Sequence, residues 1–170
     1  MIRNEEDLMD EWRKAEKRAI YESNKITLRL RKRKSKQLDV LADKVHEEVF
    51  TEINCLNCAN CCKSIPPIVS SADAQRIAKS LGMKKADFSA KYLLRDEDGD
   101  TVMNASPCPF LLPDNHCEIY EDRPKACRAY PHTNDWQFTK NIGLHAVNSK
   151  YCPAVFHILK RLDENGRRVK

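Results

Sequence analysis

The stretch Cys55-Leu-Asn-Cys58-Ala-Asn-Cys61-Cys62 places four thiols within eight residues, in the pattern C-x2-C-x2-C-C. A C-x2-C spacing lets a tight turn aim two sulfurs at one point, and the repeated step brings three sulfurs around one centre. Adjacent side chains point in different directions, so Cys61 and Cys62 either serve different sites or one of them is spare. This stretch predicts a thiolate site around which the rest of the domain folds.

Four further cysteines follow singly, each in a loop-like or helix-capping context. They are Cys108, Cys117, Cys127 and Cys152. Eight thiols match two four-coordinate sites, and thiolates are the ligands of structural zinc and of iron–sulfur clusters. We therefore expect all eight cysteines to be metal ligands: Cys55, Cys58, Cys61, Cys62, Cys108, Cys117, Cys127 and Cys152. The choice between zinc and iron stays open.

Positive charges surround one of these cysteines. Arg123, Lys125 and Arg128 lie close to Cys127 in the sequence. Such charges favour the thiolate form and offset the negative charge of a tetrathiolate. Arg123 and Arg128 are therefore the residues that we expect to contact the cofactor or to hold an anionic substrate beside it.

Other interpretations of these residues are weaker. Free cysteines are often small buried hydrophobes, which accounts for one or two single cysteines but not for four in eight residues. A thioredoxin-like pair at Cys58 and Cys61 belongs after a strand, whereas a helix is expected there. His116, His132 and His145 are alternative ligands, although each is more typical of a surface or core position.

The composition limits the class of protein. The 170 residues are 41% hydrophobic and 32% charged, with 4 Gly, which excludes collagen-like, low-complexity and wholly disordered chains. No apolar run approaches the ~20 residues of a membrane span, and MIRNEEDLMDEWRK lacks the apolar core of a secretory signal. We expect a cytoplasmic protein, because reduced thiols there suit metal or redox chemistry better than disulfides.

Hydrophobic periodicity predicts a mainly α fold with a small β-hairpin, in which a cysteine-rich metal-binding domain follows a long helical arm. Residues 1–36 are the expected arm, and residues 37–170 are the expected metal-binding domain. The expected helices cover residues 4–31, 38–53, 70–81 and 85–94, a helical face at 136–142, and a last helix from 153. Residues 101–104 are an expected strand, and 110–112 with 117–120 an expected hairpin.

The arm ends in the basic run Arg29–Lys36, which has no acidic residue. Such a run contacts RNA, DNA or an anionic membrane in some proteins, but it is more often a solvated helix end. We favour the solvated helix, because no aromatic side chains are interleaved and the net charge of +5 is too mild to indicate nucleic-acid binding. The expected partners are the metal ion or cluster and, through the arm, a protein, rather than nucleic acid or a membrane.

The cysteine-bearing segments resemble a known family. CLNCANCC, CPFL, CEIYEDRPKACRAYP and YCPAV follow one another in the order found in the CxxCxxCC cysteine-cluster proteins, which are described as zinc- or iron-chelating domains. The resemblance runs from about Cys55 to Val155, and the most specific parts are the CxxCxxCC motif and Arg123–Arg128. It implies a bacterial metal- or iron–sulfur-binding domain. A related cluster occurs in flagellin lysine methylases, where it implies an iron–sulfur centre.

Three functions follow from these observations. The first is a cysteine-cluster protein that holds zinc or an iron–sulfur cluster in an accessory or redox role. The second is an iron–sulfur-dependent enzyme, either an oxidoreductase or similar to a protein-lysine methyltransferase. The third is a structural zinc module that binds a protein or nucleic acid. No nucleophile–base pair or phosphate-binding glycine loop is present in the sequence, so whether the protein is an enzyme stays open.

Overall fold

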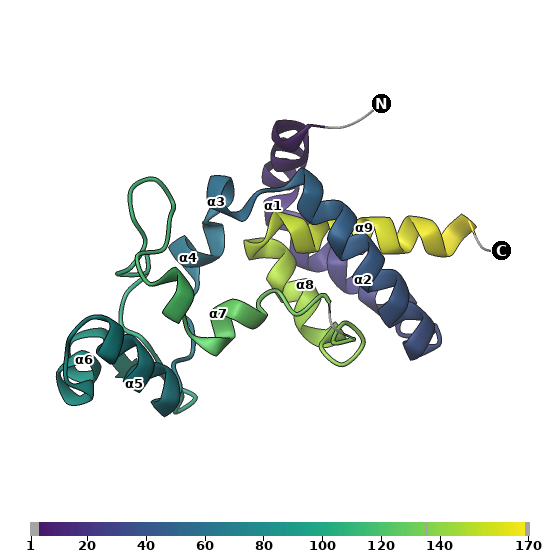
Figure 1. Cartoon of the computed structure of the whole chain (residues 1–170). Helices are drawn as coiled ribbons and strands as arrows, with labels where there is room; N and C mark the ends of the chain where they lie inside the picture. Colours follow the sequence, from purple (N-terminus) through teal and green to yellow (C-terminus); the bar gives the residue numbers. More distant parts are fainter. Residues whose placement is uncertain (1–3, 135, 169–170) are drawn as a thin grey trace. The chain divides into compact units, whose positions relative to one another are not determined.

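The computed structural model describes residues 4–134 and 136–168, which form two compact units (Figure 1). Unit 1 combines the described residues up to Cys55 with those from Pro131 onward, and unit 2 is Leu56–Tyr130. This division differs from the one expected at residue 36. It arises because the first helix of the chain packs against the last two helices instead of extending into solvent.

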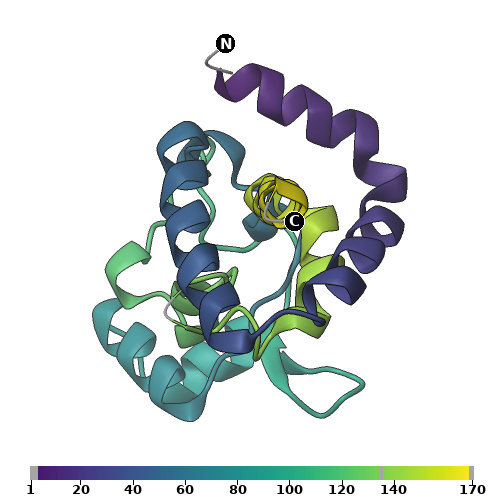
Figure 2. The same cartoon turned by 90° about the vertical axis from the view of Figure 1, so that its right-hand side faces the viewer.

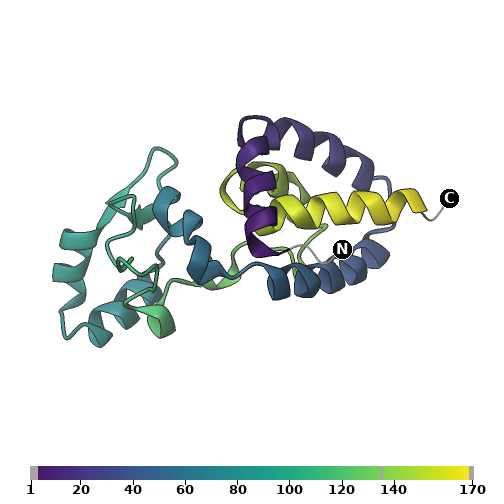
Figure 3. The same ribbon diagram turned by 90° about the horizontal axis from the view of Figure 1, so that it is seen from above.

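Unit 1 is a bundle of four helices: α1 (Glu5–Leu30), α2 (Ser35–Glu52), α8 (Ile142–Tyr151) and α9 (Pro153–Arg168). The central helix is α9, which contacts α1, α2 and α8. In Figure 2, α9 is seen end-on and α1 curves round it, while α2 runs alongside α9 in Figure 3. Ile158, Leu159 and Leu162 lie on the buried side of α9 because they recur at helical spacing.

The sequence predicts the beginning of α1 correctly. Asn4 accepts a hydrogen bond from the Asp7 backbone N–H at 2.8 Å and completes a capping box with the Asp7 side chain. Further along, Trp12 donates its Nε1–H to the Ser149 carbonyl of α8 at 2.9 Å. The small side chain of Ala19 is fully buried, so α1 contributes to the core of unit 1.

Unit 2 contains short elements around a smaller core. After α3 (Cys55–Cys58), which spans the boundary, come α4 (Asn60–Ser64), α5 (Ser71–Ser80), α6 (Lys85–Tyr92), β1 (Leu93–Arg95), β2 (Thr101–Met103), the 3-10 helix η1 (Tyr120–Asp122) and α7 (Lys125–Ala129). The two strands pair antiparallel, and α5 packs beside α6 (Figure 1). Ile77, Phe88 and Phe110 form the centre of its core.

The expected fold class is confirmed, with local corrections. The helices over residues 70–81 and 85–94 are present as α5 and α6, although Leu93 already belongs to β1. The hairpin expected from residues 110–112 and 117–120 is reduced to a bridge between Leu111 and Cys117, because the chain turns into η1 at Tyr120. The helical face expected at 136–142 was wrong, since α8 begins only at Ile142. Within the described residues, no helix has the length and apolarity needed to cross a membrane.

Candidate metal centre

The C-x2-C-x2-C-C motif folds as two short helices separated by a left-handed residue. Ala59 lies between α3 and α4, has a φ of 46° and is 5% exposed. A non-glycine residue adopts this conformation only when its surroundings hold it there. The break places Cys61 and Cys62 together on α4, with their Sγ atoms 4.0 Å apart.

Backbone contacts join Cys62 to Cys108 directly and to Cys117 through the segment that follows Cys108. The Cys108 N–H donates to the Cys62 carbonyl at 2.8 Å. Three residues later, Leu111 forms a β-bridge with Cys117, and the Glu118 N–H donates to the Phe110 carbonyl at 2.9 Å. Residues more than forty positions apart in the sequence are therefore held in one part of unit 2 by main-chain contacts.

The helix that carries Cys127 is anchored by a charged residue on α5. Asp73, which is 3% exposed, accepts hydrogen bonds from the Lys125 N–H at 3.2 Å and from Arg76 at 2.6 Å. Burial opposes ionisation of this carboxyl, but bonds from Ser70, Arg76 and Lys125 outweigh it and lower its pKa to about 2. An ionised Asp73 thus fixes the start of α7 and, with it, the position of Cys127.

Electrostatic interactions connect four thiols of unit 2. Burial and the negative charges of Cys62, Cys108 and Cys117 together raise the pKa of Cys127 to about 12. Burial also raises the pKa values of Cys108 and Cys117, with a contribution from Cys62 to each. Cys62 behaves differently: a hydrogen bond from Cys61 and the charges of Arg123 and Lys63 outweigh burial and lower its pKa to about 7.

Arg123 supplies positive charge to this cluster. Its guanidinium lies 3.7 Å from the centre of the Tyr120 ring, and its charge lowers the pKa values of Cys62, Cys117 and Cys127. Its Nη1 is buried and has no hydrogen-bond partner among the residues that the structure describes. A buried donor without a partner is costly, so this nitrogen is suited to a negatively charged neighbour.

Arg128, the second expected cofactor-binding residue, contacts protein backbone instead. Its Nη1 donates to the Arg123 carbonyl at 2.6 Å, and Arg76 donates to the same carbonyl at 3.0 Å. Two guanidinium groups therefore hold the backbone of Arg123 in place. The sequence identified both arginines near the cysteines, and the structure gives them different surroundings.

The remaining candidate ligands lie elsewhere. Cys55 is exposed and Cys58 is half-buried, while Cys152 follows α8 and packs against the core of unit 1. His116 is exposed beside Asp114, at 3.3 Å, and His145 is fully buried in unit 1, where its Nε2 lies 2.9 Å from the Phe138 carbonyl. Over residues 4–134 and 136–168, no three Cys, His, Asp or Glu side chains stand in ligand geometry for a metal ion.

A family model for the "CxxCxxCC: Putative zinc- or iron-chelating domain" matches residues 54–153. The chain belongs to the CxxCxxCC family. The matched segment of this CxxCxxCC protein contains all of unit 2 and every one of its eight cysteines. No curated protein and no solved structure matches the chain.

Several supporting residues of the CxxCxxCC domain were not predicted. The positive charge of Lys63 lowers the pKa of Cys62. Arg76 donates a hydrogen bond to the Arg123 carbonyl, and the Tyr120 ring contacts the Arg123 guanidinium. The capping box of Ser70 and Asp73 was recognised from its spacing, but the bond from Asp73 to Lys125 joins residues 52 positions apart. Local patterns contain no signal for such a long-range contact.

His145 gives a test that is independent of any metal. Burial, assisted by the nearby charge of His132, lowers the pKa of His145 to about 4, below the ordinary value of 6.5. The unfolded chain therefore binds a proton at a higher pH than the folded chain, and unit 1 loses stability as the pH falls from about 6.5 toward 4. Between pH 7 and pH 5 the loss should be about 2 kcal/mol.

We expect His145→Gln to remove this pH dependence, and His116→Gln, at an exposed site of unit 2, to leave it unchanged. Urea unfolding followed by tryptophan fluorescence measures the free energy of unfolding of unit 1 at each pH, because Trp12 and Trp136 both belong to unit 1. Equal slopes of stability against pH in the wild type and in His145→Gln would contradict the assignment.

Proposed function

We propose that unit 2 binds zinc or an iron–sulfur cluster through the thiolates of Cys62, Cys108, Cys117 and Cys127. The observation that carries this proposal is that three separate segments bring four half-buried thiols close enough for the negative charges of Cys62, Cys108 and Cys117 to oppose ionisation of Cys127. Four thiols with no disulfide among them form the donor set of a tetrahedral thiolate site. A bound metal would supply the positive charge that lets all four ionise together.

The positive side chains fit such a site. A tetrathiolate around a divalent ion carries two net negative charges, and Arg123 already favours the ionised forms of three of the four thiols. Lys63 adds a second positive charge beside Cys62. We propose that Arg123 compensates the charge of the loaded site and that Arg128 positions Arg123 through its backbone.

The other cysteines remain proposed ligands on their sequence spacing alone. Cys55, Cys58 and Cys61 keep the C-x2-C-x2-C pattern, and Cys152 is the eighth thiol. The proposed role of the protein is accessory or redox, in the bacterial cytoplasm. A site saturated by four thiolates is structural or transfers electrons, whereas a catalytic metal keeps an open position.

One observation favours a second candidate function, that of an iron–sulfur-dependent enzyme. The buried Nη1 of Arg123, which has no described partner, is suited to an anionic group bound beside the cluster. In that case one of the four thiols would not be a ligand, and the vacant position would face Arg123. The number of sulfur ligands therefore separates the two functions.

The experiment is anaerobic purification followed by metal analysis, a visible spectrum and X-ray absorption at the metal edge. We expect four sulfur ligands at the site of unit 2 and a loss of about one metal equivalent in Cys127→Ser. Ser80→Ala is the control, because Ser80 is exposed in the same unit and is no proposed ligand. It should retain the protection from hydrogen exchange around residues 108–117 that Cys127→Ser loses. Unchanged metal content and unchanged protection in Cys127→Ser would show that the proposed ligand set is wrong.

A further inference from the structure

The positive charge of the chain is concentrated in one short segment of unit 1. Residues 21–36 contain seven Lys and Arg and one Glu, a net charge of +6, whereas the whole chain carries +5. The rest of the molecule is therefore slightly negative. This segment covers the second half of α1 and the turn that leads into α2; we call it the basic patch.

Most cations of the basic patch are exposed and form no ion pair with the described residues. Arg29 is neutralised by two hydrogen bonds to Asp163 of α9, at 2.8 and 2.7 Å. Five other side chains are exposed and make no ion pair with any residue in the described part of the chain: Lys25, Arg31, Lys32, Lys34 and Lys36. Uncompensated cations at this density create a positive potential that attracts a polyanion.

The patch also presents apolar surface between its cations. Tyr21, Lys25 and Leu28 follow one another at four- and three-residue steps, which places them on one face of α1, and Lys32 follows in the turn after the helix. Tyr21 is 63% exposed and Leu28 is 61% exposed, and the Lys25 Nζ lies 4.2 Å from the centre of the Tyr21 ring. The sequence disfavoured nucleic-acid binding partly because residues 29–36 contain no aromatic side chain. The structure places the exposed ring of Tyr21 on α1, close to this run in the sequence.

The character of the patch distinguishes among polyanionic partners. Lysine is depleted from protein–protein interfaces, which have an apolar centre larger than one Tyr and one Leu. A helix that enters a membrane surface needs a continuous apolar face, but the apolar face of α1 is buried in unit 1 through Ile26 and Leu30. A row of exposed cations is typical of a surface that contacts the phosphate backbone.

We propose that the basic patch binds the sugar–phosphate backbone of double-stranded nucleic acid without sequence specificity. Five unpaired cations should contact up to five phosphates, and each contact releases a bound counterion from the duplex. The logarithm of the association constant should then fall with the logarithm of the salt concentration with a slope of about −4.5.

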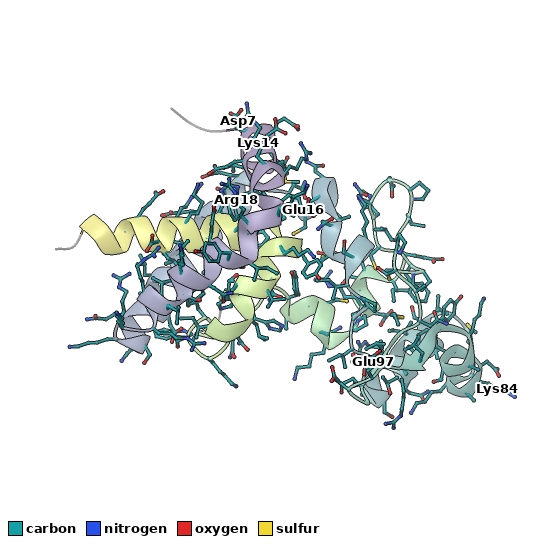
Figure 4. All side chains as sticks on the ribbon, turned by 180° about the vertical axis from the view of Figure 1, so that it is seen from behind. Asp7, Lys14, Glu16, Arg18, Lys84 and Glu97 are labelled. Atoms are coloured by element: carbon teal, nitrogen blue, oxygen red, sulfur yellow. The ribbon has the colours of Figure 1, made fainter. Side chains whose placement is uncertain are left out.

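The test uses the full chain as purified, with fluorescently labelled RNA and DNA duplexes, and follows fluorescence anisotropy over a series of KCl concentrations. Lys32→Glu/Lys34→Glu/Lys36→Glu should lower the affinity at least tenfold and flatten the slope by about 3. The matched control is Lys79→Glu/Lys84→Glu/Lys91→Glu, which changes net charge equally on exposed positions of unit 2. Lys84, one of the control positions of unit 2, is labelled in Figure 4, as are Lys14 and Arg18 of α1. The control should retain the affinity.

Three results would overturn the proposal. They are no binding to either duplex at low salt, an equal loss of affinity in the control, and binding to vesicles that contain phosphatidylserine without binding to a duplex. Circular dichroism melting of both variants checks that unit 1 remains folded. A preference for RNA or for DNA would identify the kind of duplex and would support the proposal in either case.

Discussion

Stripping the metal with a strong chelator under anaerobic conditions should unfold unit 2 and leave unit 1 folded. Metal binding to a thiolate site contributes on the order of 10 kcal/mol to folding in small zinc domains. Unit 2 has a small core, whose centre is Ile77, Phe88 and Phe110, and its Cys108 and Cys117 pack directly against that core. Loss of the metal would leave half-buried thiols held by short backbone contacts and by this small core.

Hydrogen exchange measured by mass spectrometry locates the effect along the chain. Protection should be lost over residues 56–130 and retained in α1, α2 and α9. Tryptophan fluorescence supplies the control, because both tryptophans report on unit 1 and should not change. A chelator-treated protein that is free of metal and keeps its protection in unit 2 would contradict a folding role for the site.

Replacing Leu159 by Ala should destabilise unit 1 by about 2–5 kcal/mol. Leu159 is fully buried on α9, the helix that contacts the three others of the bundle. Truncation removes buried apolar surface and leaves a cavity that four helices cannot close without losing other contacts. The metal content of unit 2 should stay the same, because no ligand is proposed on α9.

Urea unfolding followed by tryptophan fluorescence measures this change. Leu144→Ala is the matched control, since Leu144 is 51% exposed on α8 and its truncation should change the free energy of unfolding by less than about 0.5 kcal/mol. Equal effects of the two substitutions would mean that α9 is not the centre of the bundle.

The sequence predicted the regular elements better than the site. Asn4 and Ser70 are recognisable helix caps because each is followed three residues later by an acidic partner, and both capping boxes are present. The buried face of α9 followed from its periodicity. Patterns of this kind are local, so a single segment contains all the information that they need.

The arrangement of the cysteines depends on contacts that no local pattern records. The spacing of Cys55, Cys58 and Cys61 predicts three converging sulfurs, yet the left-handed Ala59 divides the motif. It is Cys62, which lies outside this repeated spacing, whose carbonyl accepts the hydrogen bond from Cys108. Neither the backbone conformation of an alanine nor a pairing across 46 residues could be predicted from the residues themselves.

The discontinuous course of unit 1 along the chain has a consequence for synthesis on the ribosome. Its first two helices are made early, but the helix that fills the centre of the bundle is made last. Unit 2 is continuous in sequence and is complete before α9 exists. Because domains fold as their segments emerge, the cysteine-bearing unit can fold while α1 and α2 still expose apolar faces. The N-terminal helices are thus the part of the nascent protein that most needs protection from aggregation until translation ends.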